Sequence, residues 1–295
     1  MQPGCKHFRK NHYFRGKITD MRKFKLLVSM LAVFTAVSCG QKQAPKALVL
    51  YYSQTSNTKA VAEEIAAKTG ADIEEIVAVN PYDGDFEATI GRCLQERESG
   101  TLPEIQPLAS DLSAYDVIFL GYPVWFGTYA PPVITLLKQI DLSGKKVVPF
   151  CTFGSGGLDS SVRDLKAAQP GAEVLDGYGV RAARIAAVPK EVDNFLKSEG
   201  FIEGEYVKPE PFPELHPASE EEAAILDAAI ADYPMLQGTK ATAAASRSIP
   251  EGTEYLFTAM PQPRGNDPKM PPAMEMKIYV TVEEGQAPVF TQVIR

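Results

Sequence analysis

Short apolar runs alternate with helical patterns between residues 47 and 200. The first run, 47–52, has no alternation of polar and apolar positions, which is typical of a strand covered on both faces. In residues 58–69 the apolar positions recur at helical spacing, and Gly70 follows where such a helix would end. The same patterns predict strands at 73–77, 117–122, 146–151 and 173–178, and helices at 86–98, 131–137, 158–168 and 189–198. Five strand–helix units joined by right-handed crossovers predict an α/β fold with a doubly wound parallel sheet over residues 47–200.

The pattern changes after residue 200. Residues 201–218 form a predicted linker, because four prolines stand between positions 208 and 217. Ser219 and Glu222 have the spacing of a capping box, and an amphipathic helix follows them. Four β-like runs come next, at 239–247, 253–260, 274–282 and 289–294. One helix followed by an antiparallel meander predicts a small α+β domain over residues 219–295.

Residues 1–39 have the pattern of an upstream segment followed by a secretory signal, with Met21 as the expected start. A basic stretch at 22–25 precedes an apolar run at 26–37, which is shorter than the roughly 20 residues needed to span a bilayer. The sequence Ala36-Val37-Ser38-Cys39 resembles the lipobox of bacterial lipoproteins, although that family prefers leucine at the first position. We therefore expect lipidation of Cys39. The alternative is ordinary signal cleavage nearby, which would leave a free thiol.

A lipid on Cys39 would set where the protein resides. Two or three acyl chains give stable attachment, and residues 40–46 would serve as a polar tether. The sequence thus predicts an exported bacterial lipoprotein, periplasmic or at the cell surface, that touches the membrane only through its anchor.

The charge of the chain narrows the choice of partners. The formal net charge is −7, and removal of residues 1–38 takes away eight basic residues and one acidic residue, which leaves −14. Such a chain is not expected to bind nucleic acid, and an anionic lipid surface would repel its body. The three histidines and four cysteines are too few for a dense metal or disulfide scaffold, and no metal site is expected. In an exported protein Cys93 and Cys151 could pair, but nothing in their spacing indicates a disulfide, and we interpret them as small buried apolar residues.

The segment after the first strand has the composition of a phosphate-binding loop. Ser53-Gln54-Thr55-Ser56-Asn57-Thr58 leads from that strand directly into a helix, whose N-terminus offers unpaired N–H groups and a partial positive charge. The segment has no lysine and no triphosphate-loop pattern, so a monoester phosphate held by neutral donors fits it. The alternative is a Ser/Thr cluster that only caps the helix.

Two further loops follow strands at the same predicted edge of the sheet. Pro123-Val124-Trp125-Phe126-Gly127 holds the single tryptophan, and Thr152-Phe153-Gly154-Ser155-Gly156-Gly157 adds another aromatic ring and bare backbone amides. Ligands of such sheets bind beyond the carboxyl ends of the strands. The three loops therefore predict a site for a planar aromatic ring that carries a phosphate. The alternatives are that the rings pack the loops and that the glycines only serve turns.

On these motifs, residues 47–200 resemble the flavodoxin family. The matching segments are Tyr-Tyr-Ser-Gln-Thr-Ser-Asn-Thr at 51–58, Gly-Tyr-Pro-Val-Trp-Phe-Gly at 121–127 and Pro-Phe-Cys-Thr-Phe-Gly at 149–154. The resemblance implies a five-stranded parallel sheet of order 2-1-3-4-5, noncovalent binding of FMN, and electron transfer. Many members have glycine where Ser56 stands, and Phe153 is the nearest candidate here for a second aromatic residue against the ring.

The resemblance also implies roles for individual residues. The amides of 54–58 and nearby hydroxyls would hold the phosphate, Trp125 and Phe153 would flank the isoalloxazine ring, and Gly127 would face its N5 atom. The expected cofactor-binding residues are Ser53, Gln54, Thr55, Ser56, Asn57, Thr58, Pro123, Val124, Trp125, Phe126, Gly127, Thr152, Phe153, Gly154, Gly156 and Gly157. No catalytic side chain is expected, because the flavin does the redox chemistry.

Three functions follow from this pattern. The first is an electron carrier with FMN as its small-molecule partner, whose redox partner protein the sequence does not identify. The second is an NAD(P)H-dependent quinone or nitro-compound reductase on the same fold. The third is a binding protein that has kept the fold and lost the flavin.

Residues from about 219 onward resemble the cystatin-like fold. Cystatins block cysteine proteases with a Gln-x-Val-x-Gly hairpin, and with Gly252 as its glycine this chain has Ser248 and Pro250 at the other two positions. Inhibition of cysteine proteases is therefore not expected. We expect this part of the chain to be an interaction or dimerisation module.

Overall fold

The computed structural model describes residues 45–206, 208–261 and 274–294. The predicted signal segment, Cys39 and most of the tether lie outside the described residues.

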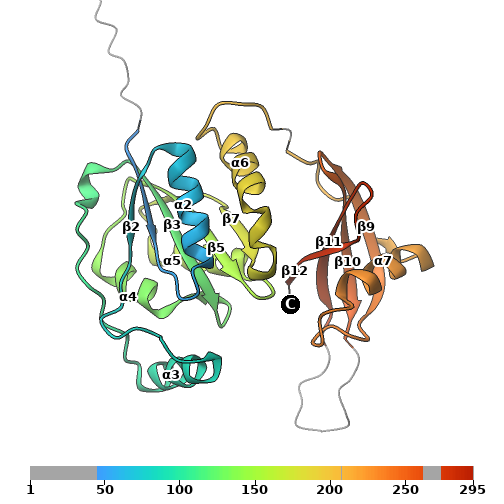
Figure 1. Cartoon of the computed structure of the whole chain (residues 1–295), viewed down its shortest axis with the longest axis horizontal. Helices are drawn as coiled ribbons and strands as arrows, with labels where there is room; N and C mark the ends of the chain where they lie inside the picture. The colour runs from blue at the N-terminus through green and yellow to red at the C-terminus, as the bar shows by residue number, and fades with distance from the viewer. Residues whose placement is uncertain (1–44, 207, 262–273, 295) are drawn as a thin grey trace, which may run out of the picture. The chain divides into compact units, whose positions relative to one another are not determined.

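A parallel sheet forms the first half of the described chain (Figure 1). Its strands are hydrogen-bonded in the order β2-β1-β3-β5-β6, with β7 also parallel to β5. The bounds are β1 Ala47–Tyr51, β2 Asp72–Glu75, β3 Val117–Trp125, β5 Lys146–Phe153, β6 Glu173–Val174 and β7 Tyr178–Arg181. Because β6 and β7 occupy the fifth strand position, the predicted order 2-1-3-4-5 is confirmed. The two-residue strand β4, Thr128–Tyr129, pairs antiparallel with the end of β3.

The predicted fifth strand is divided into two parts. A proline inside a central strand is unusual because it has no N–H to donate, and Pro149 lies in the middle of β5. The N–H of Lys146 points toward β3, where it donates to the Asp116 carbonyl. Because the direction of the backbone N–H groups alternates along a strand, the backbone nitrogen of residue 149 faces β6 and β7. That position faces the break between β6 and β7, where Gly177 has a φ of 81°. The missing donor therefore stands opposite the interruption of the fifth strand.

Helices cover both faces of the parallel sheet, as its apolar strands require. Two of them, α2 Asn57–Thr69 and α6 Val188–Ser198, share one buried cluster with alternate residues of β1, β3 and β5. On the opposite face, α4 Pro131–Gln139 and α5 Leu158–Ala168 pack against the other set of alternate residues. Such a doubly wound arrangement confirms the predicted fold class.

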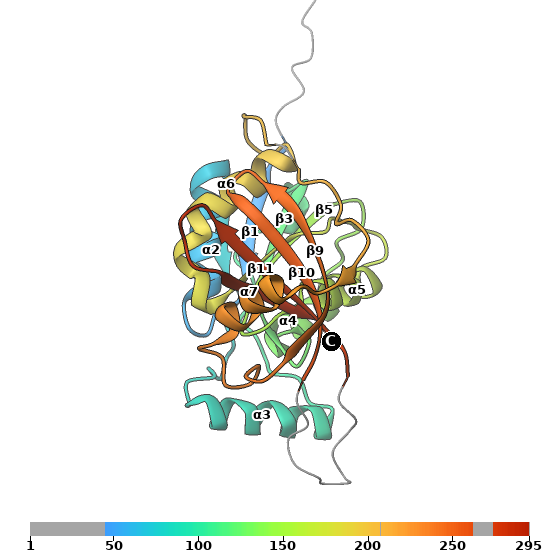
Figure 2. The same cartoon turned by 90° about the vertical axis from the view of Figure 1, so that its right-hand side faces the viewer.

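The remaining helix of this half, α3 Phe86–Ser99, lies beyond the carboxyl ends of the strands (Figures 1 and 2). Asp85 caps its N-terminus by accepting a hydrogen bond from the Ala88 N–H. One buried residue of α3, Cys93, joins the core cluster of the α4 face. Both Cys93 and Cys151 are buried free thiols, as predicted.

The C-terminal part is an α+β domain with its own core, as predicted. Its strands form an antiparallel sheet of order β12-β11-β10-β9-β8, and α7 packs across one face of that sheet (Figure 2). The bounds are β8 His216–Pro217, α7 Glu220–Ile230, β9 Lys240–Ile249, β10 Gly252–Met260, β11 Met276–Glu283 and β12 Val289–Ile294. The predicted capping box is present, since Ser219 and Glu222 each accept from the backbone N–H of the other. The cystatin-like resemblance stays a prediction.

Within the described residues, no helix has both the length and the apolar character needed to cross a membrane.

Candidate functional site

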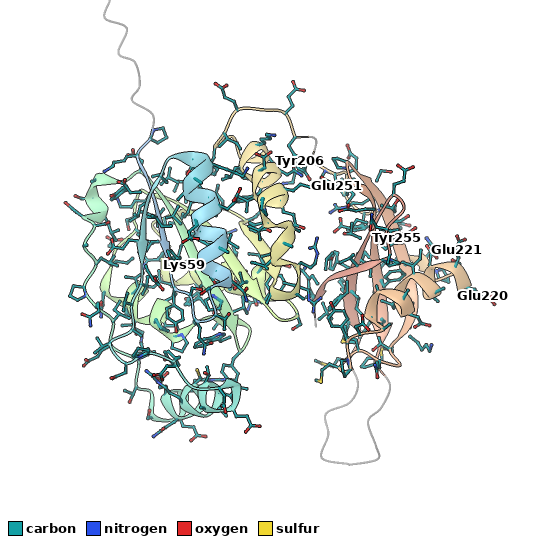
Figure 3. All side chains as sticks on the ribbon, viewed as in Figure 1. Lys59, Tyr206, Glu220, Glu221, Glu251 and Tyr255 are labelled. Carbon is teal, nitrogen blue, oxygen red and sulfur yellow. The ribbon has the colours of Figure 1, made fainter. Side chains whose placement is uncertain are left out.

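The predicted phosphate loop forms a tight entry into α2. Ser56, the residue before the helix, has a left-handed backbone with φ of 62° and ψ of −2°, and its side chain makes no capping hydrogen bond. The Ser53 hydroxyl accepts from the Lys59 N–H at 3.2 Å, and Lys59 stands in the first turn of α2 (Figure 3). The first amides of a helix have no acceptor within it. The loop therefore directs amide donors and hydroxyls toward the carboxyl edge of the sheet.

The first and third predicted loops meet through a buried pair of hydroxyls. Thr58 Oγ1 and Thr152 Oγ1 are 2.8 Å apart, and the two residues are 1% and 5% exposed. One hydroxyl donates to the other, so the pair keeps one hydroxyl hydrogen for a further acceptor.

The second loop is a two-residue hairpin turn between β3 and β4. Trp125 pairs with Thr128, and the two residues between them have positive φ, 52° at Phe126 and 82° at Gly127. Positive φ at both central residues is the geometry of a type I′ turn. It is unusual for a phenylalanine, and such outliers gather at functional sites. The Phe126 side chain is 51% exposed.

The second and third loops are also in contact. The Ser160 hydroxyl, at the start of α5, donates to the Gly127 carbonyl at 2.6 Å. A Cβ on Gly157 would lie 2.6 Å from Cγ1 of Val124. All three predicted loops therefore come together at one edge of the sheet.

Trp125 lies on the side of the phosphate loop. Its ring packs edge-on against Tyr52, at 6.0 Å between ring centres, and against Tyr82, at 5.2 Å. It also lines a hollow of about 220 Å³ together with Gln54 and residues of α3. The single tryptophan is thus close to the predicted phosphate loop.

Phe153 is placed differently from the prediction. Strand β5 is two residues longer than expected, and alternation puts Phe153 on the same buried face as Cys151. The side chain is 4% exposed, and a Cβ on Gly179 would lie 2.8 Å from its ring. We therefore correct the expectation that Phe153 flanks a bound ring, because its ring has no open face.

Sequence reasoning missed the part that α3 plays at this edge. Gln54 Nε2 donates both to the Tyr82 carbonyl at 3.0 Å and to the Thr89 hydroxyl at 2.9 Å. The phosphate loop is thereby connected to α3 and to the segment before it. Only the tertiary fold brings these segments, about 30 residues apart, into contact, so no local pattern could have revealed the link.

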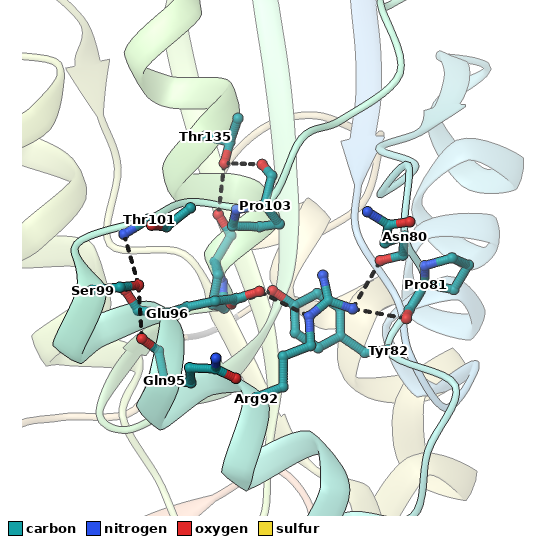
Figure 4. A network of polar contacts seen from close by, with 11 residues as sticks. Asn80, Pro81, Tyr82, Arg92, Gln95, Glu96, Ser99, Thr101, Pro103 and Thr135 are labelled. Atoms are coloured by element: carbon teal, nitrogen blue, oxygen red, sulfur yellow. Dashed lines mark hydrogen bonds and ion pairs between the residues drawn. The ribbon is translucent and has the colours of Figure 1, made fainter.

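A polar network fixes α3 to the segment at 80–82 (Figure 4). The Arg92 guanidinium lies 3.7 Å from the centre of the Tyr82 ring and donates to Glu96 and to the carbonyls of Asn80 and Pro81. The Tyr82 hydroxyl donates to Glu96 at 2.7 Å. Burial, together with the adjacent Glu96 carboxylate, raises the pKa of Tyr82. Tyr82 therefore stays a hydroxyl donor at neutral pH.

The remaining predicted residues line the same region. Pro123 pairs with Thr152 in the sheet, and the Asn57 amide donates to the Thr55 hydroxyl at 3.2 Å. The Gly154 carbonyl accepts from Arg181. Gly156 lies against β12, since a Cβ there would be 2.4 Å from the Val293 carbonyl oxygen. In the described residues, no group of His, Cys, Asp or Glu side chains could hold a metal ion.

Comparisons with known proteins identify relatives of the first half of the chain. A putative flavoprotein from Bacteroides eggerthii DSM 20697 is 30% identical, with 50% of this chain and 96% of that chain covered and a TM-score of 0.44. A putative flavoprotein from Bacteroides uniformis ATCC 8492 is 27% identical, with 51% and 99% covered and a TM-score of 0.45. A flavoprotein from Lactobacillus acidophilus NCFM, solved in complex with FMN, is 31% identical, with 50% and 99% covered and a TM-score of 0.42.

No curated protein matches the chain. The flavodoxin family model matches residues 46–195, which is half of the chain and includes all three loops. This chain therefore belongs to the flavodoxin family.

Proposed function

We propose that this protein binds FMN noncovalently and transfers electrons. The observation that carries the proposal is the meeting of three loops at the carboxyl edge of the sheet, joined by the Thr58–Thr152 and Ser160–Gly127 hydrogen bonds. Membership of the flavodoxin family supports the same cofactor.

The start of α2 fits a phosphate monoester. The loop 53–58 contains no carboxylate, and the left-handed turn at Ser56 leads into the first helical turn, where the Asn57 and Thr58 amides precede the first intrahelical hydrogen bond. Ser53 and Thr55 are not buried, and the Thr58–Thr152 pair keeps one hydroxyl hydrogen to donate. Neutral donors of this kind would hold the phosphate of FMN.

Aromatic and glycine residues of the second loop would border the ring. Trp125 lines the hollow beside Gln54, and Phe126 is the half-exposed aromatic residue of the same turn. The Gly127 carbonyl is fixed by Ser160, which holds the turn in one position. Bound FMN would supply the redox chemistry by accepting and donating electrons, and the residues of the chain hold and orient it.

The visible absorption spectrum of the purified chain 40–295 tests FMN binding. We expect a yellow protein, or one that takes up about one FMN when the cofactor is added. Thr58→Val should weaken FMN binding about tenfold, because it removes the hydroxyl pair without changing the shape of the side chain. Thr135→Val is the matched control, because Thr135 is a buried threonine whose hydroxyl donates to the Pro103 carbonyl, away from the three loops. A chain that binds no FMN would overturn the proposal and favour a flavin-free binding protein.

A reductase is the second candidate, favoured by one observation. A cavity of about 610 Å³ borders Gly127, which leaves room for a second small molecule beside the proposed ring site. Steady consumption of NADPH in the presence of a quinone would support the reductase. An electron carrier would instead exchange electrons with a redox protein and leave NADPH unchanged.

The proposal includes a lipid anchor at Cys39 that holds the protein at a bacterial membrane. The lipobox-like sequence 36–39 supports it, and the charge of −14 on the chain after residue 38 means that the body itself would not bind anionic lipid. The test is to produce the full-length protein in a bacterial host and to partition it between a detergent phase and an aqueous phase. Cys39→Ser should move the protein from the detergent phase to the aqueous phase. Ser38→Ala keeps a small residue before the cysteine and should leave the partition unchanged. Equal partition of the Cys39→Ser variant and the unaltered protein would contradict the anchor.

A further inference from the structure

We propose that the cavity of about 610 Å³ beside Gly127 binds a small planar carboxylate, with Arg181 as its anchor. The loop at 154–157 and the start of α5 form one side of this Arg181 cavity, and the segment 233–236 and β12 of the C-terminal domain form the other. All of these residues belong to one compact unit, residues 45–295.

Arg181 is a buried cation without an anionic partner. It stands at the end of β7 and is 5% exposed. Its Nε donates to the Gly154 carbonyl at 2.8 Å, and its Nη1 donates to the Tyr233 hydroxyl at 2.8 Å and the Phe290 carbonyl at 3.2 Å. The rings of Tyr233 and Phe290 lie 4.3 and 4.1 Å from the guanidinium carbon. None of its hydrogen-bond partners in the described residues is a carboxylate, so the buried positive charge has no hydrogen-bonded counter-ion.

The second terminal nitrogen of Arg181, Nη2, is not used in these hydrogen bonds. Every fully buried side-chain nitrogen or oxygen of the described residues has a hydrogen-bond partner, so Nη2 must have access to solvent. Arg181 lines the cavity, and it is otherwise enclosed by Gly154, Tyr233 and Phe290. The unpaired N–H groups of Nη2 are therefore available to a molecule in this cavity.

The N-terminus of α5 lines the same cavity. Leu158, Asp159 and Ser160 open this helix of 11 residues, and Gly157 before them provides no side-chain cap. Their backbone N–H groups have no carbonyl partner within the helix, so they provide hydrogen-bond donors and a partial positive charge at the cavity. Asp159 is the one acidic residue in the lining, and it is exposed. The balance of donors therefore favours an anionic oxygen.

The rest of the lining indicates the shape of the ligand. Met235, Leu236, Phe290 and Val293 provide apolar walls, and the volume is that of ordinary small-molecule sites. A carboxylate has two oxygens, of which one can accept from Nη2 and the other from the amides of α5. A flat apolar body would lie against the aromatic and aliphatic walls.

Calorimetric titration of the chain 40–295 with 2-naphthoate tests the site. Its neutral isostere, 2-naphthamide, serves as the ligand control and should bind at least about tenfold more weakly. Arg181→Met should weaken naphthoate binding about tenfold or more. Arg184→Met should leave it unchanged, because Arg184 pairs with Glu191 and does not line this cavity. Equal affinity for the acid and the amide would overturn the proposal, as would unchanged binding by a folded Arg181→Met chain.

A second variant keeps the test decisive if Arg181→Met does not fold. Asp159 is exposed, so Asp159→Asn should fold normally and strengthen naphthoate binding roughly threefold at low salt, with no effect on the amide. No gain in affinity would count against an anion site.

Repeating the titration with FMN separates this proposal from the proposed function. A chain that fails to bind FMN but binds naphthoate would refute the cofactor and support the cavity. Displacement of naphthoate by FMN would show that the flavin ring occupies the cavity. That result would overturn a separate carboxylate site and would leave the proposal of FMN binding intact. Simultaneous binding of both molecules is the expected result.

Discussion

Single residues at the carboxyl edge of the sheet carry backbone conformations that their side chains disfavour. Ser56 and Phe126 both have positive φ, and each belongs to a loop predicted to contact the cofactor. The left-handed region costs an ordinary residue roughly 1–2 kcal/mol, while glycine adopts it freely. The glycine that many flavodoxins have at the position of Ser56 thus fits the backbone seen here. Both strained residues therefore stand in loops that we propose to hold the cofactor, and backbone strain of this kind clusters at functional sites.

Substitution of Ser56 measures this strain. We expect Ser56→Gly to be more stable than Ser56→Ala by about 1 kcal/mol, because alanine keeps the disfavoured φ and the serine hydroxyl makes no cap bond to lose. Urea unfolding monitored by circular dichroism gives the difference. In α2, four residues further on, the exposed Ala60 provides a control of opposite sign, since Ala60→Gly should destabilise by about 1 kcal/mol. Equal stability of the two Ser56 variants would contradict the left-handed backbone.

At the scale of elements, the sequence predicts the sheet and the helix α3, but not the position of α3 in the fold. The strands are continuous apolar runs, so their pattern and the order of the units lead directly to the doubly wound fold. The position of α3 depends on Arg92, which reaches the carbonyls of Asn80 and Pro81 only when the segment before the helix folds back. Phe153 was misassigned because its strand continues past residue 151, which turns its side chain into the core. Arg181 was missed because its partners lie 27, 52 and 109 residues away.

The Arg92 network should control the mobility of α3. Arg92→Met removes an ion pair and two hydrogen bonds to carbonyls, so we expect α3 to be destabilised by about 1–3 kcal/mol. Hydrogen exchange should then become faster in α3 and stay unchanged in α4. The Arg163–Asp164 pair is exposed, and Arg163→Met should therefore change neither helix. Unchanged exchange in α3 of the Arg92 variant would show that packing alone holds the helix.

At the scale of the whole molecule, buried tyrosines make stability depend on alkaline pH. Burial, with a smaller effect of the Glu75 carboxylate, raises the pKa of Tyr51 to about 12, and burial also raises the pKa of Tyr52, Tyr122 and Tyr178. A raised pKa means that the unfolded chain loses these protons first, near pH 10. Stability is therefore fully present below pH 10 and should fall as the pH rises toward 12. Urea midpoints between pH 8 and 11 should show this fall, and Tyr51→Phe should make it shallower; a flat profile would contradict these environments.

The contact between the β5–α5 loop and β12 should couple the two folded parts of the molecule. The Val293 N–H donates to the Ser155 carbonyl at 2.8 Å, and Arg181 spans the same boundary. A Cβ on Gly156 would lie 2.4 Å from the backbone oxygen of Val293, so Gly156→Ala must push β12 away from the loop. We expect a loss of about 1–3 kcal/mol and a thermal transition that splits in two, because each part keeps its own core.

Gly154→Ala is the matched control for this coupling, because a Cβ there would meet no atom within 4 Å. It should unfold like the unaltered chain. Calorimetry distinguishes the outcomes. A single unchanged transition for Gly156→Ala would mean that β12 moves without loss of stability. The C-terminal domain would then lie beside the flavodoxin-like domain without stabilising it. If the transition does split, the loop that borders the proposed flavin site depends on the C-terminal domain for its position. A ligand or partner that binds the C-terminal domain would then alter the proposed cofactor site.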